Sequence, residues 1–168
     1  MQEWLNWLVS KTSEPLPAPR VRIPLSPPEI IFMQLGVSMK DSIFTKIVAG
    51  EIPAHKVYED DATLAFLDIF PQHEGHVLII PKIYPTEFIW DLDPETYLAV
   101  METAQKVALR LREVLPYQYV CQKIVGTDVP YAHVHLVPFD ATSELHADRS
   151  DTDHDALADL AKKLYFED

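Results

Sequence analysis

The chain has 168 residues, 48% of them hydrophobic and 24% charged, which is enough to bury a sizeable core within a single domain. Its formal net charge of −12 at pH 7 leaves no basic stripe that could follow a phosphate backbone, so we expect no nucleic-acid partner. Cys121 is the only cysteine, which excludes an intrachain disulfide and indicates a reducing, cytoplasmic compartment.

The first part of the chain, residues 1–38, shows neither helical nor strand periodicity, and six prolines fall within residues 14–28. The apolar run at residues 30–37 is far shorter than the roughly 18–20 residues of a membrane span, so no membrane association is expected. We therefore predict a proline-rich N-terminal extension over residues 1–38, disordered or not natively translated, and one domain over residues 39–168.

The first predicted element of that domain is a short helix over residues 42–50, with Asp41 as its N-cap and Gly50 at its C-terminal stop. Short runs rich in β-branched and aromatic residues follow, bounded by turn-forming residues, which predicts strands. These strands cover residues 56–60, 63–69 and 76–82.

A long helix is predicted next, because Asp93 can cap it, Pro94 suits its first turn and Pro116 stops it. Apolar residues recur between these limits at helical spacing, which predicts one buried face. The stripe consists of Tyr97, Met101, Ala104, Ala108, Leu111 and Leu115.

Two further strands are predicted at residues 117–125 and 131–139, joined at residues 126–128 by a tight connection typical of a hairpin. An acidic helix over about residues 152–166 closes the chain, with acidic residues in its first turn and lysines in its last, as its dipole favours. The order of elements predicts an α+β domain in which helices pack on an antiparallel sheet.

Side chains alternate in the strand YAHVHLVPF (131–139), so that one face is apolar and the other carries polar rings. The apolar side chains are Ala132, Val134 and Leu136, and the rings belong to Tyr131, His133 and His135.

A single histidine on a strand is more often structural than catalytic, but the pair His133 and His135 beside a tyrosine favours a functional site. With His76 as a third ligand the pair could bind a metal, although no carboxylate stands at ligand spacing beside it. Alternatively, a neutral imidazole can attack phosphorus near pH 7.

The segments LAFLDIFPQHEGHVLIIPK (64–82) and VPYAHVHLVPF (129–139) together resemble the histidine triad, or HIT, family. The signature of that family is three histidines alternating with apolar residues, after an Asp-Ile-x-Pro segment and a Gly-His strand that ends in Pro-Lys. The resemblance implies a HIT-like α+β fold, with a five-stranded antiparallel sheet, a long helix, and flanking short and C-terminal helices. It also implies a homodimer.

The resemblance further implies a hydrolase or nucleotidyl transferase that forms a covalent nucleotidyl-histidine and needs no cofactor or metal. Its nucleophile matches His133, whose second ring nitrogen is held by the carbonyl group of Tyr131. His135, His76 and Tyr131 would surround the phosphate. The implied substrates are nucleoside phosphoramidates, dinucleoside polyphosphates or related phosphate esters.

The same resemblance implies a nucleotide-binding set around these catalytic residues. Asp68 matches a carboxylate that contacts the ribose hydroxyls, and Ile69 lies beside the base. The rest of the set is Gly126, Thr127 and Val129.

The sequence departs from the family pattern in three places. Tyr131 replaces the first histidine of the triad, and Asp128 adds an anion where the phosphates are expected. Ser42 and Thr45 replace a zinc-binding cysteine pair of many bacterial relatives, so that zinc should be absent. The alternatives to an enzyme of this family are therefore a nucleotide-binding module with little or no turnover and, less favoured, a metal-dependent hydrolase.

Overall fold

The structure is a computed structural model that describes residues 42–83, 85–146 and 153–167 of the chain. The predicted N-terminal extension and its boundary at Met39 lie outside the described residues. Those residues belong to a single unit that spans positions 38–168.

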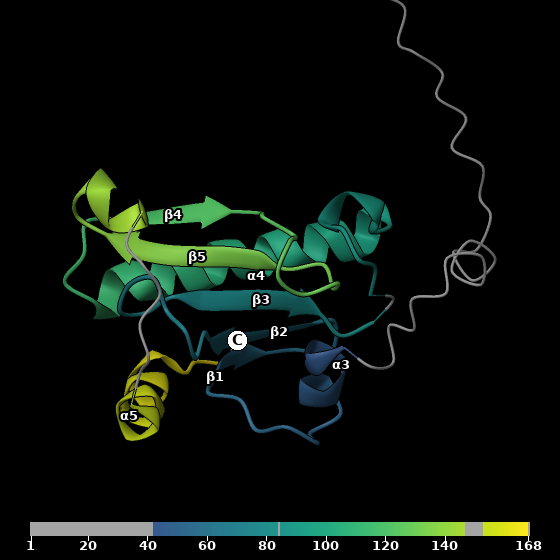
Figure 1. The fold of residues 1–168 in the computed structure, drawn as a ribbon, viewed down its shortest axis with the longest axis horizontal. Helices are drawn as coiled ribbons and strands as arrows, with labels where there is room; N and C mark the ends of the chain where they lie inside the picture. The colour runs from purple at the N-terminus through teal and green to yellow at the C-terminus, as the bar shows by residue number, and fades with distance from the viewer. Residues whose placement is uncertain (1–41, 84, 147–152, 168) are drawn as a thin grey trace, which may run out of the picture. The chain divides into compact units, whose positions relative to one another are not determined.

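The core of the unit is a five-stranded antiparallel sheet with strand order β1-β2-β3-β5-β4, as expected for an α+β domain. β5 lies between β3 and β4, and the long helix α4 packs along one face (Figure 1). The strands are β1 (Lys56–Glu59), β2 (Thr63–Leu67), β3 (Val77–Pro81), β4 (Tyr119–Lys123) and β5 (Val134–Phe139). The helices are α3 (Ile43–Val48), α4 (Pro94–Val114) and α5 (His154–Leu164), with 3-10 turns η2 (Ile89–Asp91) and η3 (Thr142–His146).

The short helix α3 begins one residue later than the sequence suggested. Ser42 is its N-cap, because its backbone is extended and its hydroxyl accepts the N–H of Phe44 at 3.3 Å. The prediction that Asp41 caps this helix was therefore wrong. Gly50 has φ +75°, which is the left-handed conformation expected just after a helix end.

The long helix α4 has the predicted N-cap, since the Asp93 carboxylate accepts the N–H groups of Glu95 and Thr96 at 3.1 Å. Its buried face is rotated slightly from the predicted stripe. Val100 and Val107 are fully buried, whereas several members of the predicted stripe are only partly buried. These partly buried residues are Tyr97, Met101 and Ala108.

The connection between β4 and β5 is longer than the predicted tight hairpin. It runs from residue 124 to residue 133, with Gly126 at φ +75°, and β5 begins only at Val134. His133 thus precedes the strand, while His135 lies within it and pairs with Leu78 of β3 and Lys123 of β4.

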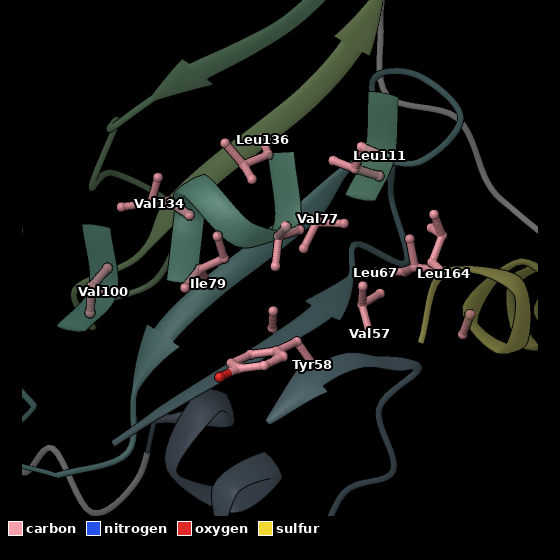
Figure 2. Packing of buried hydrophobic residues seen from close by; sticks show 14 of the residues in the cluster. Val57, Tyr58, Leu67, Val77, Ile79, Val100, Leu111, Val134, Leu136 and Leu164 are labelled. Carbon is pink, nitrogen blue, oxygen red and sulfur yellow. The ribbon is translucent and has the colours of Figure 1, made fainter. Parts of the chain in front are cut away.

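The two faces of the sheet contribute to two separate clusters of buried residues. On one face, Val134 and Leu136 of β5 pack with Val77 and Ile79 of β3 against the buried side of α4 (Figure 2). On the other face, Phe44 and Ile47 of α3 cover a smaller cluster. That cluster also contains Leu64, Phe66, Leu78, Ile80 and Tyr131.

The C-terminal helix α5 is capped by Asp153, whose carboxylate accepts the N–H of Asp155 at 3.0 Å. It packs against β1, β2 and α4, and Arg110 of α4 donates to the carbonyl groups of Lys163 and Leu164 near its end. Among the helices that the structure describes, none combines the length and apolar character required to cross a bilayer.

Candidate functional site

A cavity of about 210 Å³ opens on the face of the sheet that α4 leaves uncovered. Phe44 of α3, Phe66 of β2 and Leu78 of β3 give it an apolar floor. Its polar lining residues are Asp68, Asp128, His133 and His135. The cavity therefore joins an apolar compartment to two imidazoles, the combination that a flat aromatic ring with an attached phosphate would require.

His133 is almost completely buried and its ring is held from two sides. Its Nδ1 lies 2.6 Å from the carbonyl oxygen of Tyr131, so Nδ1 carries the proton and donates it. The Phe44 ring meets the imidazole edge to face, with centroids 5.4 Å apart. The lone pair consequently lies on Nε2, the nitrogen that a nucleophilic imidazole must leave unprotonated.

His135 and His76 form a second, connected pair. His76 Nε2 lies 3.0 Å from His135 Nδ1, and the backbone N–H of Gln72 donates to His76 Nδ1 at 3.3 Å. Because Nδ1 of His76 accepts, its Nε2 carries the proton and donates to His135. His135 then has its own proton on Nε2, which makes it a hydrogen-bond donor.

Asp68 directly follows β2 and lies beside this pair. One of its carboxylate oxygens accepts the N–H of Phe70 at 2.9 Å, and the other lies 3.4 Å from His76 Nδ1. The sequence shows no carboxylate at ligand spacing beside His133 and His135, but the turn after β2 brings Asp68 to His76.

This proximity raises the question of a metal, since ligand atoms of Asp68, His76 and His135 lie within 4.8 Å of one another. One ion takes a single atom from each ligand. His76 Nδ1, however, lies 3.4 Å from the Asp68 carboxylate, whereas its Nε2 contacts His135 at 3.0 Å. A metal bound by these three residues would therefore have to replace the hydrogen bond between His76 and His135.

The Tyr131 side chain lies outside the cavity lining. It is 1% exposed, and its hydroxyl donates to the carbonyl oxygen of Pro81 at 2.6 Å. Burial raises the pKa of this phenol to about 12, so it stays protonated near neutrality. The expectation that the phenol stands at the phosphate differs from this placement, and what Tyr131 offers the site is its carbonyl group.

The predicted nucleotide-binding residues are only partly brought together. Ile69 and Val129 line the cavity with Asp68, and Ile69 is 41% exposed at its mouth. Gly126 and Thr127 are not among its lining residues, and the Thr127 hydroxyl donates to the carboxylate of Asp128 at 3.1 Å.

A second cavity of about 340 Å³ lies on the other side of His76, between the turn after β2 and α5. Its walls include Glu74 and Asp153 as well as Asp68, so a phosphate would meet several carboxylates there. Because His133 does not border it, the smaller cavity is the candidate site.

One basic residue near the site was not singled out from the sequence. Lys123 of β4 is the cross-strand partner of His135, and its ammonium group donates to the side-chain oxygen of Gln72. The alternation of residues 117–125 places Lys123 on the same face of the strand as Cys121. Only the register of β4 against β5 shows that His135 is its neighbour.

Comparison with known proteins agrees with this architecture. The HIT domain family matches residues 49–142. The adenosine 5'-monophosphoramidase HNT1 of Saccharomyces cerevisiae is 38% identical to the chain over 128 residues, which is 73% of this chain and 79% of the yeast protein.

Similar solved structures cover most of the domain. A Hit-like protein involved in cell-cycle regulation from Bartonella henselae superposes with a TM-score of 0.69 at 30% identity, covering 76% of this chain and 96% of that one. A zinc-bound histidine triad family protein from Mycobacterium smegmatis gives a TM-score of 0.64 at 31% identity, covering 74% and 93%.

Proposed function

This chain belongs to the HIT domain family, and on that premise we propose that it hydrolyses or transfers nucleotidyl groups through a covalent intermediate on His133. The observation that carries the proposal is the 2.6 Å contact from His133 Nδ1 to the Tyr131 carbonyl group. That contact leaves Nε2 as the free nucleophile in a ring that lines the cavity.

The bound nucleotide would place its base in the apolar part of the cavity, beside Phe44, Leu78 and Ile69. Asp68 would accept hydrogen bonds from the ribose hydroxyls, since it lines the cavity and a carboxylate offers several acceptor positions. Gly126, Thr127 and Val129 would enclose the nucleotide from the connection between β4 and β5. These apolar walls support purines without selecting one of them.

The proposed reaction on a phosphoramidate proceeds in two displacements. His133 Nε2 attacks phosphorus, the P–N bond breaks, and the amine leaves after it takes one proton from the site. The nucleotidyl-imidazole keeps its Nδ1 proton, so the ring is positively charged. The Tyr131 carbonyl group, which accepts this N–H, stabilises the charge. Water then attacks phosphorus and returns one proton to the site, and His133 leaves as the neutral imidazole.

His135 would stabilise the phosphoryl oxygens during both displacements. His76 fixes its tautomer, so that His135 presents Nε2–H as a donor. Preformed donors directed at developing negative charge supply most of the rate acceleration in phosphoryl transfer. His76 acts through His135 and is therefore a positioning residue.

The choice of substrate rests on the relatives. The yeast protein that matches this chain is named an adenosine 5'-monophosphoramidase, which supports a nucleoside phosphoramidate. Dinucleoside polyphosphates and related esters remain within the proposed class. A nucleotide-binding module without turnover is the second candidate, supported by the Tyr131 phenol, which is engaged with Pro81 and adds no charge to the phosphate site.

We also propose that the chain functions as a homodimer joined along β4. This strand is an edge of the sheet, and an edge strand readily pairs with a second copy. Exposed apolar side chains lie on this strand and next to it, since Tyr119 of β4 is 48% exposed and the neighbouring Leu109 of α4 is 59% exposed. Analytical ultracentrifugation of the wild type and Leu109→Glu tests this, since a dimer that forms there should dissociate in the variant.

The test of the proposed function is a panel of adenosine and guanosine phosphoramidates and dinucleoside polyphosphates, assayed with the wild type and His133→Asn. The variant should lose at least about 10³-fold in turnover yet bind AMP within about tenfold of the wild type, because a nucleophile contributes mainly to the chemical step. Near wild-type turnover by His133→Asn would refute the assignment. A wild type that binds AMP but processes no substrate would support the binding module.

A further inference from the structure

Lys123 stands beside the imidazoles of the candidate site without a role in the reaction described above. It lies directly opposite His135 in the antiparallel pair of β4 and β5, so the two side chains emerge from the same face. Such opposed residues have Cβ atoms about 5 Å apart. The Lys123 ammonium donates to the side chain of Gln72, whose backbone N–H in turn donates to His76.

The strand order places Lys123 on one side of β5 and the apolar cavity on the other. Phe66 of β2 and Leu78 of β3 line that cavity, whereas Lys123 belongs to β4. If the base occupies the cavity, the ribose and its 5'-oxygen approach phosphorus from the side of β3. In the displacement by His133 the three remaining oxygens spread around phosphorus, so the two that do not belong to the ribose face β4.

The residues that line the cavity supply little positive charge for the phosphoryl oxygens. Within the part of the chain that the structure describes, the cavity is lined by the carboxylates of Asp68 and Asp128 and by no lysine or arginine. The phenol of Tyr131 is directed at Pro81 and is uncharged. Phosphoryl transfer depends on positive charge near the oxygens of the transferred group.

We propose that Lys123 is a catalytic residue that binds the two phosphoryl oxygens facing β4, in exchange for its contact with Gln72. This rests on the proposed function, because it takes the nucleotide at His133 as given. The flexible four-carbon stem of a lysine allows such an exchange with little change in the backbone. The strand would thus supply the positive charge that Tyr131 does not.

A structural role competes with this proposal, since Lys123 could act only by tethering the turn after β2 through Gln72. Gln72→Ala separates the two roles, because it removes the tether and keeps the ammonium group. Lys123→Arg keeps a cation, and Lys123→Met removes the charge but preserves an unbranched stem. Lys162→Met serves as the control, because it removes an exposed lysine of α5 that pairs with Asp159.

The experiment measures the dissociation constants of AMP and adenosine and, separately, the turnover of adenosine 5'-phosphoramidate. Lys123→Met should reduce the preference for AMP over adenosine about tenfold or more and lower kcat about 10²-fold, the typical loss of one charge-stabilising donor. Lys123→Arg should restore most of both. Gln72→Ala and Lys162→Met should each stay within about threefold of the wild type.

Two results would overturn the role of Lys123. One is a Lys123→Met variant with the AMP preference of the wild type, and the other is a Gln72→Ala variant that reproduces the full loss. The AMP preference is independent of turnover, so a wild type without activity would refute the reaction, and the AMP preference would still decide whether Lys123 binds the phosphate. If the wild type bound neither AMP nor adenosine, both proposals would fail.

Discussion

Buried side chains on the two faces of β5, counting His133 just before the strand, contact different kinds of neighbours. Toward α4, Val134 and Leu136 are fully buried among apolar neighbours (Figure 2). Toward α3, His133 and His135 are each 3% exposed, almost as buried, yet their ring nitrogens contact a carbonyl group and another imidazole. Four consecutive residues are therefore buried to a similar extent, although two of them contact apolar side chains and the other two make polar contacts.

The difference shows how one segment can serve both stability and chemistry. Apolar side chains contribute free energy by leaving water, in proportion to the area they bury. A buried imidazole must instead recover its lost hydration through hydrogen bonds, so its partners also fix its tautomer. We expect substitutions on the α4 face to change stability and those on the α3 face to change the reaction.

The largest expected effects come from the neighbours Leu136 and His135. Leu136→Ala should lower the free energy of unfolding by roughly 2–5 kcal/mol, with kcat nearly unchanged where the protein is folded. His135→Gln should lower kcat roughly 10²- to 10³-fold with a much smaller change in stability. Denaturant titration and steady-state kinetics measure both. If both variants lost stability and activity in parallel, the two faces would not be separable.

A glycine substitution can disturb the α3 face through its backbone. Gly75 precedes His76 at φ +80°, and a Cβ there would lie 2.5 Å from Leu115 Cδ1. Gly75→Ala should therefore cost roughly 2–3 kcal/mol of stability and displace His76, which lowers turnover. Gly50→Ala is the matched control, because φ is +75° but no atom lies within 4 Å. It should cost about 1 kcal/mol and leave turnover unchanged. Equal effects of the two would argue against crowding at Gly75.

Tyr131→Phe removes one buried hydrogen bond, to Pro81, and should cost about 1 kcal/mol of stability while turnover stays near the wild-type value.

Burial raises the pKa of Tyr131 to about 12 from its ordinary 10, so the unfolded chain releases this proton first. The contribution of this protonated phenol to the free energy of unfolding is complete below pH 10 and is lost as the pH rises through 12. Chemical denaturation across this window should show a steeper loss in the wild type than in Tyr131→Phe. Parallel curves would contradict the burial of the phenol.

The smallest effect is expected from removing residues 1–38. A chain that begins at Met39 should keep its melting temperature and turnover, because the proline-rich sequence of residues 1–38 lacks the periodicity of a packed helix or strand. Differential scanning calorimetry and the same kinetic assay measure both. A large loss of stability would show that the extension packs on the domain.

Much of the fold followed from local signals in the sequence. Asp93 and Pro94 predicted the start of α4, and the alternation around Val134 and Leu136 predicted the buried face of β5. Caps and period-two patterns are properties of neighbouring residues, so a single chain displays them. The cap of α3 was missed because Asp41 and Ser42 are adjacent and both suitable, and only backbone geometry selects Ser42.

The site was less predictable, because it depends on contacts between distant segments. The resemblance supplied His133, His135 and His76, but the approach of Asp68 to His76 depends on the turn after β2. The place of Lys123 depends on the register between β4 and β5, which a tight hairpin would have fixed but a longer connection does not. The alternation put Tyr131 on the face of His133 and so allowed its side chain to lie beside that imidazole or against the neighbouring strand, and the contact with Pro81 of β3 selects the second.

The central claim, a covalent intermediate on His133, is tested most directly by the stereochemistry at phosphorus. An adenosine phosphoramidate made chiral at phosphorus with sulfur would be hydrolysed in isotopically labelled water, and the configuration of the product determined. Two successive in-line displacements through His133 predict overall retention of configuration. Inversion would show that water attacks the substrate directly and would contradict the account.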